Sequence, residues 1–355
     1  MNSPPTYYVS ALVLVNLHPR LPATGYEIFR DTGSKVKEDR HVITRRSLIN
    51  LGWLSLVNIL WASQFPAYKV ATVRMSVSAL SFYTFVFAIL ILLPFLWKER
   101  RAASRGSRVS TTQRSDLKAW ILLAVIGILP PSILMSWGIE HSSGSNAAIL
   151  TLTIPILMLV IAVPLLGERL TWIRAGTLLL ALIGTVFVSR DDLIGGKFTM
   201  STLLGNLMIL AACGGSAFYN IYSKHLLARN TELEVLVYGY VFAAVLCAGT
   251  SWYLDPRPFY DVIGLPLSTW IAIGVLGGLT WGISMVLFMW LLKHVDLGQI
   301  SVSIYLLSFF GVLMSAAMLG EHVRASQMVG GLIVATATLL ADSYERRRAR
   351  SAETA

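Results

Sequence analysis

The chain has few charged residues, and long parts of it have none. Asp, Glu, Lys and Arg make up only 14% of its 355 residues, whereas a soluble domain carries about 25%. A hydrophobic content of 55% also excludes a disordered chain. Between residues 47 and 341, ten long stretches lack all four charged residue types: 47–68, 75–97, 119–139, 141–167, 175–189, 198–223, 235–254, 262–292, 297–320 and 325–341.

The lengths of these stretches indicate membrane-spanning helices. Most hold about 20 residues or more, the number that crosses the core of a bilayer as an α-helix. Two are shorter, 175–189 and 325–341, and they take the fifth and tenth places in the series. A membrane β-barrel would instead show segments of about ten residues with alternating hydrophobicity. We therefore predict an all-α membrane protein with ten transmembrane helices.

The positive charges are distributed unequally between the two sides of this predicted bundle. If the N-terminus is cytoplasmic, 23 of the 29 Lys and Arg residues lie in cytoplasmic segments and six in outer ones. This asymmetry places both termini in the cytoplasm and the protein in a cell membrane, such as the bacterial inner membrane. Nucleic-acid binding is not expected despite the net charge of +10, because no soluble stretch is long enough for such a domain. Residues 1–46 are predicted as a disordered cytoplasmic tail and 343–355 as a basic one.

The chain also lacks the short motifs of enzymes and of ATP-driven pumps. Neither HExxH, nor GxSxG, nor GxxxxGK[ST] occurs in it. Its two cysteines, Cys213 and Cys247, fall inside predicted helices without CxxC spacing, which favours plain packing residues. We expect no metal and no cofactor. A membrane-embedded enzyme and a non-transporting scaffold are the alternatives to a transporter.

An internal repeat relates the two halves of the chain. A shift of 153 residues aligns 135–168 with 288–321 without a gap. The aligned pairs include Trp137 with Trp290, His141 with His294, Asn146 with Gln299, and Gly167-Glu168 with Gly320-Glu321. Because each copy holds five helices, an odd number, the second copy enters the membrane from the opposite side. We predict two inverted repeats, 47–190 and 198–342, an organisation common in secondary transporters.

These features together resemble a known family. The first predicted helix contains Trp61-Ala62-Ser63-Gln64-Phe65-Pro66-Ala67-Tyr68-Lys69, and Gly-Glu closes both the fourth and the ninth helix. Over residues 47–342 the chain resembles the EamA-type members of the drug/metabolite transporter superfamily. The resemblance implies export of small metabolites, with amino-acid exporters the best-known subgroup. It also implies a central cavity between the halves, lined mainly by helices 1, 3, 4, 6, 8 and 9.

Polar and aromatic residues inside the stretches suggest where a substrate binds. Trp61 and Trp281 lie within roughly 6 Å of the centres of their stretches, whereas most of the tryptophans lie near predicted helix ends. Polar side chains at such depth face protein or water, because hydrocarbon offers them no partner. Bonding between helices is the alternative use. We predict that the substrate contacts Trp61, Gln64, Ser132, Thr153, Tyr219, Trp281, Tyr305 and Ser308.

Helix breakers and helix-end charges complete the prediction. Pro130, Pro131 and Pro155 free backbone carbonyls inside two helices and are predicted as hinges. Glu168 and Glu321 are expected to be solvated carboxylates near the start of the next helix, with a gate as the alternative. Lys69 is expected to extend to the lipid headgroups. The expected partners are the lipid bilayer and a small-molecule substrate, and the sequence leaves a homodimer open.

Overall fold

The structure is a computed structural model that describes six segments of the chain. They comprise residues 45–105, 117–166, 171–188, 200–260, 262–294 and 297–354. Helices make up almost all of these segments, which contain no β-strand. The predicted all-α fold is therefore confirmed. The predicted N-terminal tail, except for its last two residues, lies outside the described residues.

Six helices in the described segments are apolar and long enough to cross a membrane. Three are continuous α-helices: α5 (Val77–Arg105), α12 (Met200–Leu227) and α13 (Glu232–Leu254). Two are composites of the first half: α6 (Leu117–Leu122), η3 (Leu123–Ile128), η4 (Pro130–Leu134) and α7 (Met135–His141), then α8 (Gly144–Leu150), η5 (Thr151–Thr153) and α9 (Ile154–Leu166). The sixth consists of α15 (Leu267–Gly274), η7 (Val275–Ile283) and α16 (Ser284–His294).

The four remaining charge-poor stretches also hold helices, which are interrupted or have shorter apolar segments. They are α3 (Arg45–Ala62) with α4 (Gln64–Thr72), α10 (Trp172–Val188), α17 (Leu297–Leu319) and α18 (Ala325–Thr354). Two short turns, α14 (Arg257–Tyr260) and η6 (Val262–Gly264), lie between α13 and α15. The structure therefore supports six spans directly, and the count of ten stays a prediction.

Irregular helical turns occur at the predicted helix breakers. The segments η3 and η4 are π-helical and lie on both sides of Leu129, and η4 begins with Pro130 and Pro131. Proline lacks the N–H that an α-helix needs and crowds the preceding turn, so a wider turn accommodates it. Pro155 follows the 3-10 turn η5. Their role as hinges stays a prediction.

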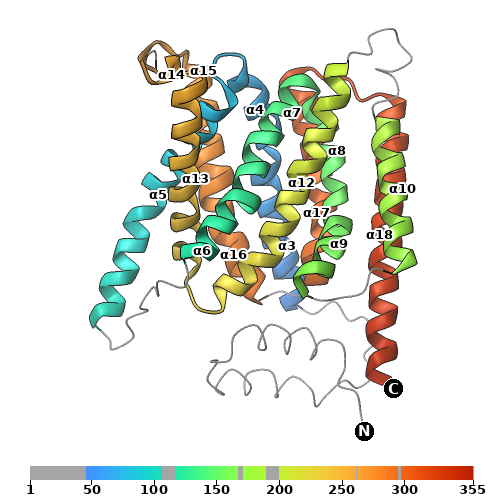
Figure 1. Cartoon of the computed structure of the whole chain (residues 1–355). Coiled ribbons are helices and arrows are strands. Elements are labelled where there is room, and N and C mark those ends of the chain that lie inside the picture. The colour runs from blue at the N-terminus through green and yellow to red at the C-terminus, as the bar shows by residue number, and fades with distance from the viewer. Residues whose placement is uncertain are drawn as a thin grey trace.

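The helices pack in pairs that lie far apart in the sequence. In Figure 1, α5 runs beside α13 on one side of the bundle and α10 runs beside α18 on the other. Between these pairs, α12 packs against η3, η4, α7 and α9, while α17 packs against α3 and α8. The segment η7 contacts α5, and η3 contacts α13. Most long-range packing thus joins a helix of the first half to one of the second.

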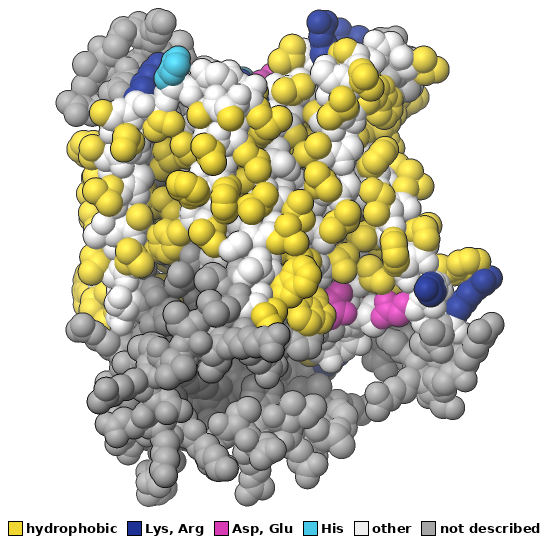
Figure 2. All heavy atoms as spheres, turned by 180° about the vertical axis from the view of Figure 1, so that it is seen from behind, with side chains coloured by type: hydrophobic (Ala, Val, Ile, Leu, Met, Phe, Trp, Pro, Cys, Tyr) yellow, Lys and Arg dark blue, Asp and Glu magenta, His cyan; other side chains and the backbone are white. Residues whose placement is uncertain are grey.

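The outer surface of the bundle is apolar over most of its height. Figure 2 shows hydrophobic side chains across the middle of the visible face, with the coloured charged side chains near its upper and lower edges. Large exposed hydrophobic side chains include Leu90, Phe95, Leu179, Val245, Phe309 and Leu332. Such a belt is stable in hydrocarbon and would aggregate in water.

Two adjacent glycines of α12 allow a test of this packing. A Cβ at Gly215 would lie 2.6 Å from Pro131 Cδ and 2.9 Å from the Ile126 carbonyl oxygen, whereas a Cβ at Gly214 would meet nothing within 4 Å. Gly215→Ala should therefore lower the free energy of unfolding by about 1–3 kcal/mol, the usual cost of overpacking. Thermal unfolding in detergent, followed by tryptophan fluorescence, measures this effect.

Gly214→Ala is the matched control for that variant. Alanine is a better helix former than glycine, so this change should leave the melting temperature unchanged or raise it slightly. Equal melting temperatures for the two variants would contradict the close approach of α12 to η4.

Candidate functional site

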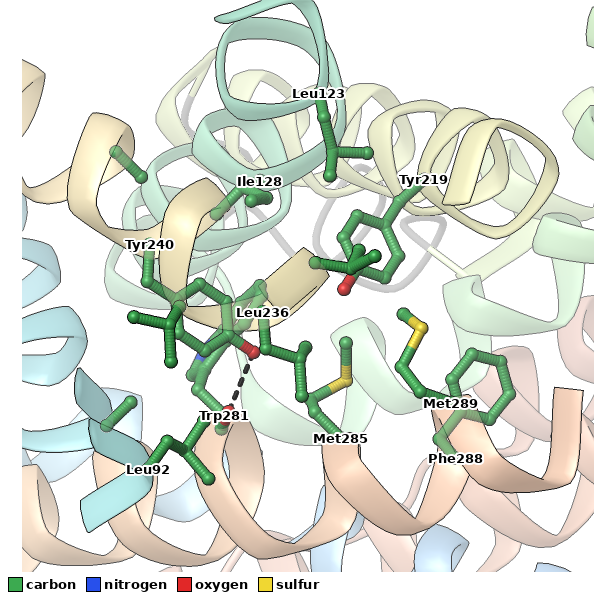
Figure 3. Packing of buried hydrophobic residues seen from close by; sticks show 14 of the residues in the cluster. Leu92, Leu123, Ile128, Tyr219, Leu236, Tyr240, Trp281, Met285, Phe288 and Met289 are labelled. Atoms are coloured by element: carbon green, nitrogen blue, oxygen red, sulfur yellow. Dashed lines mark hydrogen bonds between the residues drawn. The ribbon is translucent and has the colours of Figure 1, made fainter. Parts of the chain in front are cut away.

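The centre of the bundle holds a buried tryptophan that is bonded to two other helices. Trp281, on η7, donates from its indole Nε1 to the hydroxyl oxygen of Tyr68 on α4, over 3.2 Å. Its backbone carbonyl accepts a hydrogen bond of 2.7 Å from the Tyr240 hydroxyl on α13, which Figure 3 shows as a dashed line. A π-helical turn shifts carbonyls out of the regular ladder, so this one can serve a side chain. These contacts join α4 of the first half to η7 and α13 of the second.

Aromatic rings surround this hydrogen-bonded pair. Phe85 of α5 stacks on Tyr240 with ring centroids 5.5 Å apart and meets Trp281 edge-on at 5.3 Å. The rings of Trp61 and Phe288 lie 4.7 Å apart in the same cluster. Offset and edge-on pairs of this kind are the favoured aromatic geometries. We call these residues, together with Tyr68, the central aromatic cluster.

Polar side chains and flexible apolar ones border the central aromatic cluster. Ser132 of η4 donates to Ser81 of α5 over 2.8 Å and also lies against the Tyr68 hydroxyl. Figure 3 shows Tyr219 of α12 pointing into the same region, opposite Met285 and Met289 of α16. The Tyr219 hydroxyl is buried near that of Ser223 and makes no hydrogen bond to a described group.

Four of the eight predicted substrate contacts come together here. Trp61, Tyr219 and Trp281 pack into one hydrophobic cluster, with Ser132 beside it. Their side chains belong to α3, α12, η7 and η4, which the tertiary fold brings together. Trp281 is only 7% exposed, so it does not face lipid.

Of the other four predicted contacts, Tyr305 and Ser308 bond to other parts of the bundle. Thr153 donates to the Leu150 carbonyl of its own segment, and Gln64 is half-buried in the first turn of α4. Ser308 of α17 bonds to Thr151 over 3.0 Å. The Tyr305 hydroxyl donates to the Ala335 carbonyl of α18 over 3.4 Å, within a separate cluster. The structure therefore does not gather all eight residues into one chamber.

Sequence reasoning missed Tyr68, Tyr240 and Phe85. A signal was present for Tyr68, because it follows Trp61 by seven residues and so falls on the same helical face. Tyr240 and Phe85 gave no local signal, since each is one aromatic residue in an apolar helix.

A second polar group of residues lies where α7 ends and α8 begins. The ammonium group of Lys69 donates to the carbonyls of Ile139, Glu140 and Ser142 at 2.8, 3.1 and 2.9 Å. Lys69 therefore binds the end of α7, which corrects the expectation that it extends to the headgroups. A positive charge is favourable there, because the last carbonyls of a helix carry negative partial charge.

Glu321 binds the N–H groups at the start of α8, as Lys69 binds the carbonyls at the end of α7. Its carboxylate accepts from the backbone N–H groups of Gly144 and Ser145 at 3.1 and 2.9 Å, and from the Ser145 hydroxyl at 2.6 Å. The expectation of a solvated carboxylate near its own next helix is wrong for Glu321, because it caps a helix of the other half. Glu168, for which the same was expected, lies outside the described residues.

Three amide side chains extend this second polar group. Ser142 donates to Asn206 of α12 and Gln327 of α18 donates to Asn146 of α8, each over 2.6 Å. Asn146 also donates to the Ser142 hydroxyl over 2.9 Å. We call Lys69, Ser142, Asn146, Asn206, Glu321 and Gln327 the junction cluster.

The described residues offer no metal site. No three His, Cys, Asp or Glu side chains in the described segments lie close enough together to hold an ion. Cys213 and Cys247 are buried free thiols. The central aromatic cluster and the group at the junction of α7 and α8 therefore offer hydrogen bonds, aromatic faces and the opposite charges of Lys69 and Glu321.

An apolar belt, several membrane-spanning helices and a polar centre bonded across both halves define a multi-pass membrane protein. Comparison with known proteins identifies its class as a transporter, because the model of the EamA-like transporter family matches residues 48–190 and again 203–341. The chain belongs to the EamA-like transporter family. It is therefore not an enzyme, and the resemblance seen in the sequence is confirmed.

Individual relatives are similar over most of their length. A probable terminal-alkyne amino-acid exporter of Streptantibioticus cattleyicolor is 26% identical over 303 residues, which cover 85% of this chain and 96% of that protein. An S-adenosylmethionine uptake transporter of Rickettsia felis is 23% identical over 311 residues, covering 86% and 95%. A solved crystal structure shares the fold with a TM-score of 0.56 at 18% identity, covering 84% of this chain and 98% of that one.

The bond between Tyr68 and Trp281 gives a prediction about stability. Tyr68→Phe removes the acceptor and leaves a buried indole N–H unpaired, which should lower the free energy of unfolding by about 1–3 kcal/mol. The control is Tyr253→Phe, since Tyr253 is 87% exposed at the end of α13. Chemical denaturation in detergent measures both variants. A Tyr68→Phe protein as stable as the control would contradict this role of the hydrogen bond.

Proposed function

We propose that the protein is a secondary transporter that exports a small polar metabolite, such as an amino acid, by alternating access. Its substrate would bind in a central cavity between two inverted repeats. Membership of a transporter family supports the transport function. The relative named as an amino-acid exporter, which matches nearly its whole length, supports the substrate class.

Paired packing supports the two inverted repeats of five helices each. The shift that relates the halves also relates α10 to α18, and a shift of 155 relates α5 to α13. Both related pairs pack side by side, and the contact of α5 with η7 has its counterpart in that of α13 with η3. Such mutual packing is expected of two copies around a pseudo-twofold axis. In this reading α3 with α4, α10, α17 and α18 also cross the membrane.

Phe85 and Tyr240 add to this support. They are 155 residues apart, occupy matching places on α5 and α13, and stack on each other. The π-helical segments η3 and η7 also occupy matching places, since 275–283 shifts onto 122–130. Distorted helices in corresponding places of two halves point to the binding site.

The hydrogen bond between Trp281 and Tyr68 is the observation that carries the proposed site. It joins the two halves at the centre of the bundle, among rings from α3, α5, α13 and α16. The faces of such rings attract an ammonium group, and hydroxyls such as that of Ser132 can bind polar atoms. Met285 and Met289 offer flexible apolar surface for a side chain. Gln64 and Thr153 stay candidate contacts, whereas Tyr305 and Ser308 would contact the substrate only if the helices rearrange.

Orientation follows from the excess of Lys and Arg on one side. Both termini and the turn between α12 and α13 would be cytoplasmic, and the segment from α14 to α15 would lie outside. In Figure 1 the C-terminal end of α18 and the label of α14 lie at opposite ends of the bundle, in agreement with this arrangement. The membrane would be the inner membrane of a bacterium.

Single cysteines test this orientation. In a protein without Cys213 and Cys247, Arg229→Cys and Ile263→Cys would present exposed thiols at opposite ends of the bundle. An impermeant maleimide added to intact cells should label position 263 and leave position 229 unlabelled. Inside-out vesicles should give the reverse pattern. Labelling of both positions from the same side would refute the proposed topology.

A metabolite screen in proteoliposomes tests the transport function itself. Counterflow of labelled amino acids and other small metabolites should identify a substrate. Trp281→Ala should then weaken its binding by about 1–3 kcal/mol, roughly 5- to 150-fold, as expected for the loss of a buried aromatic contact. Equilibrium binding in detergent gives the affinity directly.

Trp252→Ala is the matched control, since Trp252 is 58% exposed near the end of α13. It should change the affinity little. A folded Trp281→Ala protein with wild-type affinity would refute the proposed site while leaving the transport function intact.

A further inference from the structure

The junction cluster connects parts of the chain that the proposed function assigns to different repeats. Lys69, Ser142 and Asn146 belong to the first repeat, whereas Asn206, Glu321 and Gln327 belong to the second. Three sets of hydrogen bonds cross between them: Ser142 to Asn206, Gln327 to Asn146, and the N-terminus of α8 to Glu321. Separation of the repeats at this end of the bundle must break all three.

Glu321 makes the strongest of these connections. It accepts three hydrogen bonds, and bonds to a charged acceptor are stronger than those between neutral groups. The positive end of the α8 backbone further favours its charge. Lys69 acts on the adjoining end of α7, and the charges of Lys69 and Glu321 attract each other.

Close helix contact lies directly beneath the junction cluster. A Cβ at Gly144 would lie 2.5 Å from Ser315 Oγ, and a Cβ at Gly311 would lie 2.6 Å from that of Ala148. One turn deeper, Thr151 and Ser308 form a buried hydrogen bond between η5 and α17. In this structure α8 and η5 therefore pack tightly against α17, and no substrate can pass between these helices unless they separate.

The sequence contains a matching set of residues for the other end. The repeat pairs Glu321 with Glu168 and Asn146 with Gln299, and Lys69 corresponds to Lys224. An inverted repeat places this second set at the cytoplasmic end of the bundle. Glu168 lies outside the described residues, so the pairing rests on sequence alone.

We infer that the junction cluster is the outer gate of the transporter and that Glu321 is the residue that holds it closed. This inference rests on the proposed function and its orientation. Glu321 positions the helices and does not bind the substrate. It acts by capping α8 only in the state that is closed to the outside.

A buried reporter thiol tests the gate without any substrate. Thr151→Cys, in a protein whose Cys213 and Cys247 are replaced by alanine, places a thiol beneath the junction cluster at a position only 1% exposed. An impermeant methanethiosulfonate reagent added from outside reaches it only when the outer end opens. Glu321→Gln should raise the labelling rate at least about tenfold, because weaker capping shifts the equilibrium towards the open state.

Glu140→Gln is the matched control for this experiment. It removes the same charge at the same end of the bundle. The side chain of Glu140 is exposed and acts on Lys69 through its charge, whereas the hydrogen bond to Lys69 comes from the Glu140 backbone carbonyl. It should leave the labelling rate unchanged. Equal labelling rates in the two variants would overturn the inference. If the Glu321→Gln protein fails to insert, Gln327→Ala replaces it and should raise the labelling rate by a smaller factor. An unchanged labelling rate in the Gln327→Ala protein would then overturn the inference.

Substrate counterflow in the same proteins separates this inference from the proposed function. Faster labelling of the Glu321→Gln protein, in a chain that moves no metabolite, would support the gate and contradict export. Unchanged labelling in a chain that does transport would reject the gate and leave the transport function standing.

Discussion

A polar group inside a membrane must find its partner within the protein, because hydrocarbon offers none. This constraint shapes the whole bundle, since helices satisfy the backbone and leave only irregular turns and side chains to be matched. The carbonyl of Trp281, in a π-helical turn, is matched by the hydroxyl of Tyr240. The indole N–H of the same residue is matched by Tyr68. The distorted helix exposes polar groups of Trp281, and tyrosines of two neighbouring helices supply the hydrogen bonds that these groups need.

The same constraint separates the neutral and the charged polar groups of the described segments. The central aromatic cluster uses hydroxyls, an indole and ring faces, whose burial costs little once they are paired. The charges of Lys69 and Glu321 stand at a helix junction near the end of the bundle. Fully ionised groups bear large desolvation costs, so helix ends with their partial charges are suitable partners. Recognition and gating thus occupy different depths in the proposed mechanism.

Close packing between the halves makes the two places interdependent. Gly215 lets α12 approach the prolines of η4, and Gly144 lets α8 approach α17. The segment η4 carries Ser132, which borders the central aromatic cluster. The helix α8 carries the N–H groups that donate to Glu321. Both contacts join the first half to the second, so a rigid-body movement of one half against the other changes them together. Alternating access needs such a link between gate and site.

The sequence by itself determined the all-α membrane fold, the family and the residues of the repeat. Three features are visible in the sequence alone: the long charge-free stretches, the unequal distribution of Lys and Arg, and the paired Gly-Glu motifs. The sequence also singles out Trp61 and Trp281 as candidate substrate contacts, since most of the tryptophans lie near predicted helix ends. Only the tertiary structure decided which residues of different helices lie next to each other. It placed Tyr305 and Ser308 away from Trp281. It also showed that Glu321 caps the start of α8 rather than the start of the helix that follows it in the sequence. Helical periodicity tells which face a side chain occupies, but the partner across that face comes from another part of the chain and depends on how the helices pack.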